Sequence, residues 1–71
     1  MIKETLIELL NQLKEATENF DISEMDHLMA SLNEYQYTEA LTEKMEQLSA
    51  FVSQFDIDNT LNMIAEIEIA L

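Results

Sequence analysis

The single histidine, His27, is the residue best suited to chemistry. An imidazole can carry a proton, bind a metal ion or accept a phosphoryl group. His27 lies between Met25 and Leu28 but off the apolar positions, and on a helix it would share a polar face with Glu24 and Ser31. We therefore expect an exposed side chain. The simplest interpretation is a surface histidine without a function of its own.

Two acidic clusters offer oxygen atoms, which hard cations prefer as ligands. They are Asp21-Ile22-Ser23-Glu24 and Asp56-Ile57-Asp58-Asn59. A calcium loop beginning at Asp56 would need Gly at its sixth position and Glu at its twelfth, where this chain has Leu61 and Ile67. Helix capping explains the same carboxylates, so we expect no metal site.

The remaining carboxylates are expected on solvated helix faces. Nothing there would desolvate one member of a pair and so separate the two pKa values for acid and base catalysis. We therefore predict that the chain has no catalytic residues, binds no cofactor and is not an enzyme.

The charge of the chain restricts its partners. Fifteen Asp and Glu residues face only Lys3, Lys14 and Lys44, for a formal net charge of −12 at pH 7. This field repels nucleic acid phosphates and anionic lipids, so we expect protein partners and no nucleic acid or membrane. The chain has no Cys, and Glu4 and Glu8 interrupt its first apolar segment, so we expect a cytoplasmic location without disulfides, signal peptide or membrane span.

Apolar side chains recur at the three- and four-residue spacing of one helix face in four segments. Gly and Pro are absent, which favours long helices joined by short polar connections. In chain order the four sets are Ile2, Leu6, Leu9, Leu13, Ala16 and Phe20; Met25, Leu28, Leu32 and Tyr35; Leu41, Met45, Leu48, Val52 and Phe55; and Ile57, Leu61, Ile64, Ile67 and Leu71.

Capping residues predict where the helices begin. Asp21 can accept hydrogen bonds from the free backbone N–H groups of the second helix, with Glu24 placed as in a capping box. Phe20 would then pack against Met25 as a hydrophobic staple. Thr38 is the expected cap of the third helix.

The first turn pattern recurs 35 residues later, as from Phe20 to Phe55. The matching stretches are Asn19-Phe20-Asp21-Ile22 and Gln54-Phe55-Asp56-Ile57, which places the cap of the fourth helix at Asp56 or Asp58. The sequence therefore indicates a duplicated helical hairpin.

This duplication predicts an all-α fold, an antiparallel four-helix bundle made of two repeated helical hairpins. The hairpins are expected at about residues 1–36 and 37–71, within a single domain 1–71. The offset is also close to the period of tetratricopeptide repeats, but two repeats are too few for a solenoid.

The last helix is apolar on more than one face near its end. Such a helix is expected to be covered on all sides, so a second copy or another domain could pack there. Two tyrosines flank the connection between the hairpins, where their rings can lie across the bundle end. The candidate interaction residues are therefore Met63, Ile67, Ile69, Leu71, Tyr35 and Tyr37.

Three stretches carry a family resemblance. They are Phe20-Asp21-Ile22-Ser23-Glu24-Met25-Asp26, Leu32-Asn33-Glu34-Tyr35-Gln36-Tyr37-Thr38-Glu39, and Leu48 with Gln54-Phe55-Asp56-Ile57-Asp58. They resemble the C-terminal helical segments of hybrid sensor kinases and other multidomain signalling proteins of Gram-positive bacteria. Those segments are similar to histidine phosphotransfer domains.

The resemblance implies a four-helix bundle that meets receiver or kinase domains. In active phosphotransfer domains an exposed histidine, here His27, accepts a phosphoryl group from a receiver aspartate. The active pattern has Lys and Gly three and four residues after the histidine, where this chain has Ala30 and Ser31. The resemblance thus favours a non-catalytic, degenerate phosphotransfer-like module of a bacterial two-component signalling protein. The alternatives are an active phosphotransfer domain using His27, and a homodimeric structural adaptor or designed helical bundle.

The charge predicts a salt-dependent stability. Repulsion within a chain of net charge −12 opposes compaction, and salt screens that repulsion. We expect the thermal unfolding temperature, followed by circular dichroism, to rise as NaCl increases from about 0.01 to about 0.5 M. An unfolding temperature that stays flat or falls would contradict this account.

Overall fold

The computed structural model describes residues 2–71, without the side chain of Ile2. It contains the helices α1 (Ile2–Glu18), α2 (Ile22–Asn33), α3 (Glu39–Ser53) and α4 (Ile57–Ala70), and no strand occurs within the described range. The predicted all-α fold is confirmed.

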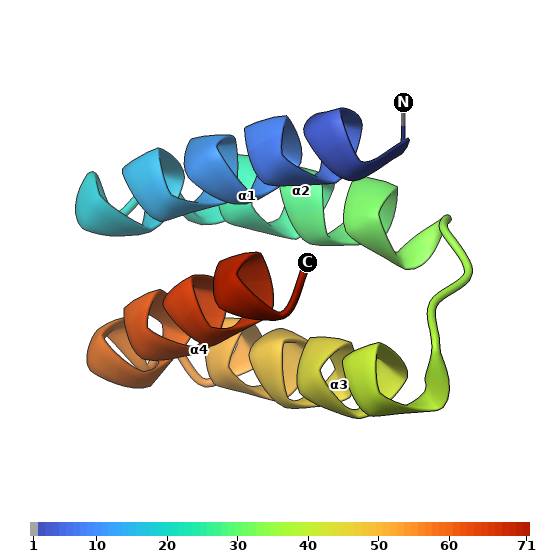
Figure 1. The fold of residues 1–71 in the computed structure, drawn as a ribbon. Helices are drawn as coiled ribbons and strands as arrows, with labels where there is room; N and C mark the ends of the chain where they lie inside the picture. The colour runs from blue at the N-terminus through green and yellow to red at the C-terminus, as the bar shows by residue number, and fades with distance from the viewer. Residues whose placement is uncertain (1) are drawn as a thin grey trace.

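The four helices form two stacked antiparallel hairpins, α1 with α2 and α3 with α4 (Figure 1). Two short turns, α1–α2 and α3–α4, lie at one end of the bundle, and the longer α2–α3 connection lies at the other (Figure 1). We call the first of these the turn end. Helix α1 also packs along α4, whereas the α2–α3 contact is the smallest of the four. The Cα atoms span 28 × 20 × 19 Å.

One hydrophobic core joins all four helices, and it explains why the apolar spacing produces this bundle. Each large aliphatic side chain removed from water contributes about 1.5–3 kcal/mol to folding. Among the described residues, the buried hydrophobic side chains are Leu6, Leu10, Leu13, Ala16, Met25, Leu28, Met29, Leu32, Met45, Leu48, Val52, Met63, Ile64 and Ile67.

The buried face of α1 is wider than its sequence pattern predicted. Leu10 is fully buried, whereas Leu9, which the pattern placed on the apolar stripe, is only partly buried. The reason is that α1 packs against α2 on one side and α4 on the other, so more than one stripe of the helix is covered.

The predicted caps are present. The side chains of Asp21, Thr38 and Asp56 each accept a hydrogen bond of 3.3 Å from the backbone N–H three residues further on. Of the two candidates for the fourth helix, Asp56 is therefore the cap. Each such cap stabilises its helix by about 1 kcal/mol, which fixes where the turns begin and end.

Two threonines are fully buried in the core, one in each hairpin, and they differ in hydrogen bonding. The Thr17 hydroxyl donates to the backbone carbonyl of Leu13 at 2.7 Å. The Thr60 hydroxyl has no hydrogen-bond partner among the described residues. A buried hydroxyl without a partner loses its hydration without compensation, so Thr60 lowers the stability of the fold.

We expect Thr60→Val to raise the free energy of unfolding by about 1 kcal/mol, because the unpaired hydroxyl is removed at nearly constant volume. Thr17→Val is the matched control and should give no such gain, since it also loses a hydrogen bond. Urea denaturation of both variants measures the difference. Equal changes in the free energy of unfolding for the two variants would show that the Thr60 hydroxyl has a hydrogen-bond partner in solution.

Candidate functional site

The turn between α1 and α2 is closed by backbone hydrogen bonds. The Phe20 N–H donates to the carbonyl of Thr17 at 3.1 Å, and the Asp21 N–H donates to that of Ala16 at 2.9 Å. This pair of bonds is the Schellman motif, which normally places Gly at the left-handed position. Here Phe20 occupies that position, with φ of 57°.

The turn between α3 and α4 repeats this geometry. The Phe55 N–H donates to the carbonyl of Val52 at 3.1 Å, and the Asp56 N–H donates to that of Phe51 at 3.0 Å. Phe55 has φ of 54°. The 35-residue sequence repeat is thus a repeat of backbone conformation at both turns.

A left-handed phenylalanine is unfavourable. Its Cβ crowds the backbone carbonyl, at a cost of about 1–2 kcal/mol that Gly would avoid. Burial of the rings does not offset this, because Phe20 is 69% and Phe55 51% exposed. Strained residues of this kind cluster at functional sites, so the two turns are the first place to look for one.

The exposure of these rings corrects the sequence interpretation. Phe20 and Phe55 were expected to continue the apolar stripes of their helices, and that prediction is wrong because each lies after the last helical turn. With a left-handed φ after the last helical turn, each of these rings is exposed. The predicted staple of Phe20 against Met25 stays a prediction, with Phe20 exposed and Met25 buried.

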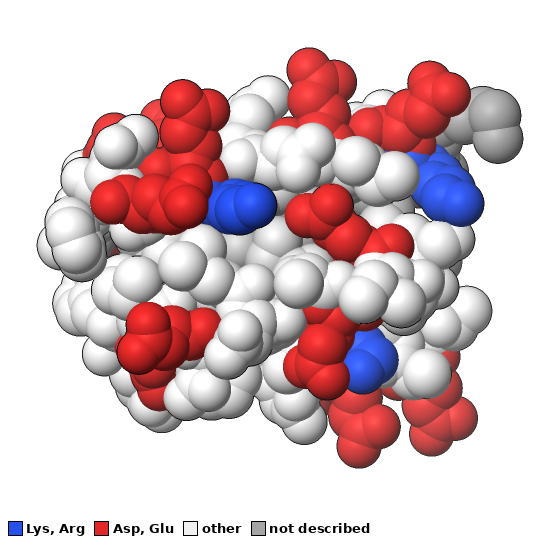
Figure 2. All heavy atoms as spheres, turned by 60° about the vertical axis from the view of Figure 1, so that its left-hand side comes forward, with Lys and Arg blue, Asp and Glu red and all other residues white. Residues whose placement is uncertain are grey.

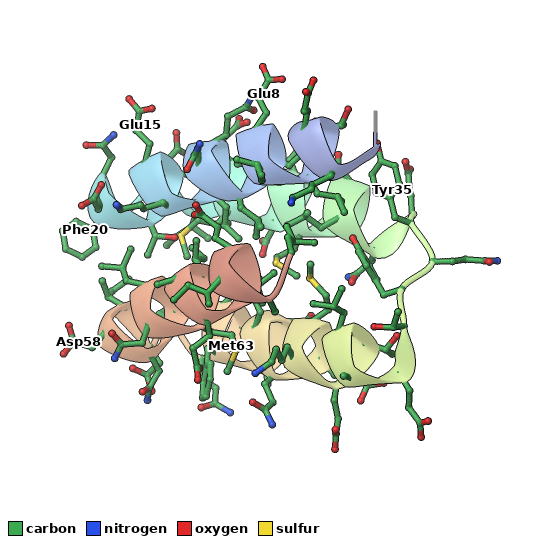
Figure 3. The ribbon with its side chains drawn as sticks, viewed as in Figure 1. Glu8, Glu15, Phe20, Tyr35, Asp58 and Met63 are labelled. Carbon is green, nitrogen blue, oxygen red and sulfur yellow. The ribbon has the colours of Figure 1, made fainter. Side chains whose placement is uncertain are left out.

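Large apolar side chains gather at the turn end. We name Phe20, Ile22 and Phe55 the turn-end patch; Ile22 is 47% exposed and begins α2 directly after the first turn. Figure 3 shows the Phe20 ring projecting beyond the helices at this end, away from the core. Among the side chains that the structure describes, the other large hydrophobic one with high exposure is Ile69, near the end of α4, at 86%.

Acidic groups lie at the same end of the bundle as the turn-end patch. A hollow of about 240 Å³ at the first turn, which includes both sequence neighbours of Phe20, is lined by Gln12, Glu15, Ala16, Asn19, Asp21 and Glu24. Asp58 projects at the same end from the start of α4 (Figure 3). The space-filling view, which brings the turn end forward, shows several groups of acidic side chains, with a few lysines beside them, on otherwise uncharged surface (Figure 2). The turn end therefore combines exposed apolar surface with negative charge.

His27 lies on α2 and is exposed, as expected from the sequence. No group of three or more His, Cys, Asp or Glu side chains that could hold a metal ion occurs within residues 2–71. The role of His27 as a phosphoryl acceptor stays a prediction.

The predicted interaction residues of α4 divide into two groups. Met63 and Ile67 are buried in the core and present no surface to a partner, so that part of the prediction is corrected. Helix α4 packs against both α3 and α1, and these neighbours within the chain cover the two apolar faces that we had expected another molecule to cover. Ile69 is exposed and Leu71 is half-buried against the core.

The predicted tyrosines lie at the end opposite the turns, as Figure 3 shows for Tyr35. Tyr35 and Tyr37 are half-buried and pack against the core. The Tyr37 hydroxyl donates a hydrogen bond to the backbone carbonyl of Leu32. Burial raises the pKa of Tyr37, and the neighbouring Tyr35 adds to the rise. These contacts tie the α2–α3 connection to the bundle, and a docking role for the two rings stays a prediction.

Two further observations concern the whole chain. None of the helices in the described range is long and apolar enough to cross a membrane. Comparison with models of known protein families, with curated proteins and with solved structures finds no match. The resemblance to histidine phosphotransfer domains accordingly stays a prediction.

Proposed function

We propose that this chain is a non-catalytic protein-docking module, and that its partner binds at the turn end of the bundle. One observation carries the proposal: the two turns at one end of the bundle each hold an exposed phenylalanine in a left-handed conformation, which does little to stabilise the fold. A Gly at either position would close the same turn at lower cost.

Exposed aromatic rings are suited to this role. Aromatic side chains supply large apolar contact areas, and residues of this class often carry most of the binding energy of an interface. Their backbones are fixed here by two hydrogen bonds per turn and by the following caps, at Asp21 and Asp56. A partner would therefore meet preorganised anchors, which lowers the entropy lost on binding.

The resemblance adds a biological setting to this proposal. It points to a receiver or kinase domain of a bacterial two-component system as the partner, and to a cytoplasmic location. The residues after His27, Ala30 and Ser31 among them, differ from those of active phosphotransfer domains. Docking without phosphoryl transfer is accordingly our main proposal.

The docking proposal predicts that the turn-end rings matter for binding and little for folding. We expect the Phe20→Gly/Phe55→Gly variant to keep its free energy of unfolding within about 1 kcal/mol of the native value, because relief of the left-handed Cβ offsets the contacts that are lost. In affinity capture from the source cells, proteins retained by the native chain should be lost from this variant.

Ile69→Gly is the matched control, since it removes an exposed apolar side chain from another part of the surface. It should retain the same proteins as the native chain. Retention of these proteins by the double variant, or no retained protein with the native chain, would contradict docking at the turn end.

A second candidate function is phosphoryl transfer through His27. The His27 side chain is exposed on α2, which favours this function because a receiver domain could reach the imidazole ring. Our main proposal predicts no transfer of labelled phosphate from a phosphorylated receiver domain to the native chain. The receiver must remain able to phosphorylate a known phosphotransfer domain. Label on the native chain, absent from a His27→Ala control, would establish the second function instead.

A further inference from the structure

The hollow at the first turn is suited to a cationic side chain. Carboxylates of Glu15, Asp21 and Glu24 line it, together with uncharged polar groups. Asp21 already accepts one hydrogen bond, from the Glu24 backbone N–H at 3.3 Å, and a carboxylate has further acceptor sites. Lys and Arg supply donors that match such acceptors, and charge makes these hydrogen bonds stronger.

The apolar patch next to the hollow fits the stem of the same side chain. Lys and Arg lay their aliphatic portion along apolar surface while the charged group stays near water or an acceptor. A cation over the face of an aromatic ring gains additional attraction. Phe20 belongs to the patch and directly precedes Asp21, so both kinds of surface lie in one turn.

The acidic residues near this end lower the stability of the fold. Glu15 and Glu18 occupy the last turn of α1, where the helix dipole disfavours anions, and that turn has no basic residue. The left-handed Phe20 follows two residues later. Such violations of local preference are expected where a surface serves binding.

The charge argues against a second copy of this chain as the occupant. In a two-fold dimer the same patch would face itself, so the hollow of one copy would approach that of the other. Two chains of net charge −12 would repel each other, and their carboxylates would have no basic partner across the contact. Charge complementarity requires a partner of the opposite sign.

From these observations, and resting on the proposed docking function, we infer that the turn end binds a basic amphipathic segment of another protein. Its apolar side chains cover the turn-end patch, and a Lys or Arg enters the hollow lined by Glu15, Asp21 and Glu24. The rings provide the apolar contact, and the surrounding carboxylates select for basic partners and raise the association rate.

The test uses a synthetic amphipathic helical peptide with Leu on one face and Lys on the other. It is titrated into the isotopically labelled full chain and followed by NMR. We expect the largest chemical-shift changes around both turns, and binding at least about tenfold weaker at 0.5 M than at 0.05 M NaCl. The same peptide with Glu in place of Lys, or Ser in place of Leu, should not bind there. Changes centred on Ile69, or none, would overturn the inference.

Two pairs of substitutions distinguish the effect of charge within the hollow from the effect of the net charge of the chain. Glu15→Gln/Glu24→Gln removes two charges from the hollow at the first turn. Glu43→Gln/Glu46→Gln removes two from another acidic hollow, of about 580 Å³, on α3. We expect the first pair to weaken peptide binding several-fold more than the second. Equal weakening would mean that only the net charge attracts the peptide, and would overturn the inference.

The Phe20→Gly/Phe55→Gly variant links this test to the docking function. We expect it to bind the basic peptide at least about tenfold more weakly, as for the loss of anchoring aromatic residues. If this variant loses the captured proteins but the native chain does not bind the peptide at the turns, docking stands and the basic partner is wrong. If the captured proteins are unaffected, the docking function itself fails.

Discussion

The fold depends on reversing a helix within three residues in a chain that has no glycine. Asp21 and Asp56 make this possible, because each serves two helices at once. The backbone N–H of each closes the preceding helix, and its carboxylate caps the following one. With both ends of the turn held by one residue, the two helices of a hairpin must lie antiparallel and in contact. Their apolar faces then meet in a single core.

The same geometry creates the exposed surface. A Schellman turn requires a left-handed residue one position before the aspartate, and in both turns that residue is phenylalanine. Its ring lies beyond the last helical turn and cannot reach the core, so the backbone that stabilises the hairpin also exposes the ring. Because the two turns lie at one end of the bundle, duplication of the hairpin doubles the apolar surface there (Figure 1).

Helix positions and caps could be predicted from the sequence because both are local properties. The spacing of Leu6, Leu13 and Leu48 defines a helix face, and an aspartate before a helix has few other roles. The conformation of Phe20 was missed because apolar spacing assigns Phe20 and Phe55 to the core and carries no information on the sign of φ. Burial of Met63 and Ile67 was missed because it depends on α4 lying between α3 and α1, a tertiary arrangement.

The unequal helix contacts also bear on how the chain folds. Most packing lies within a hairpin, between segments close in sequence, and α2 and α3 touch least. Such low contact order is typical of proteins that fold in microseconds to milliseconds, because little chain entropy is lost before favourable contacts form. Each hairpin nevertheless leaves apolar side chains of the core uncovered until the other docks. Association of α1 with α4 is therefore the step that brings residues far apart in the chain together and makes folding cooperative.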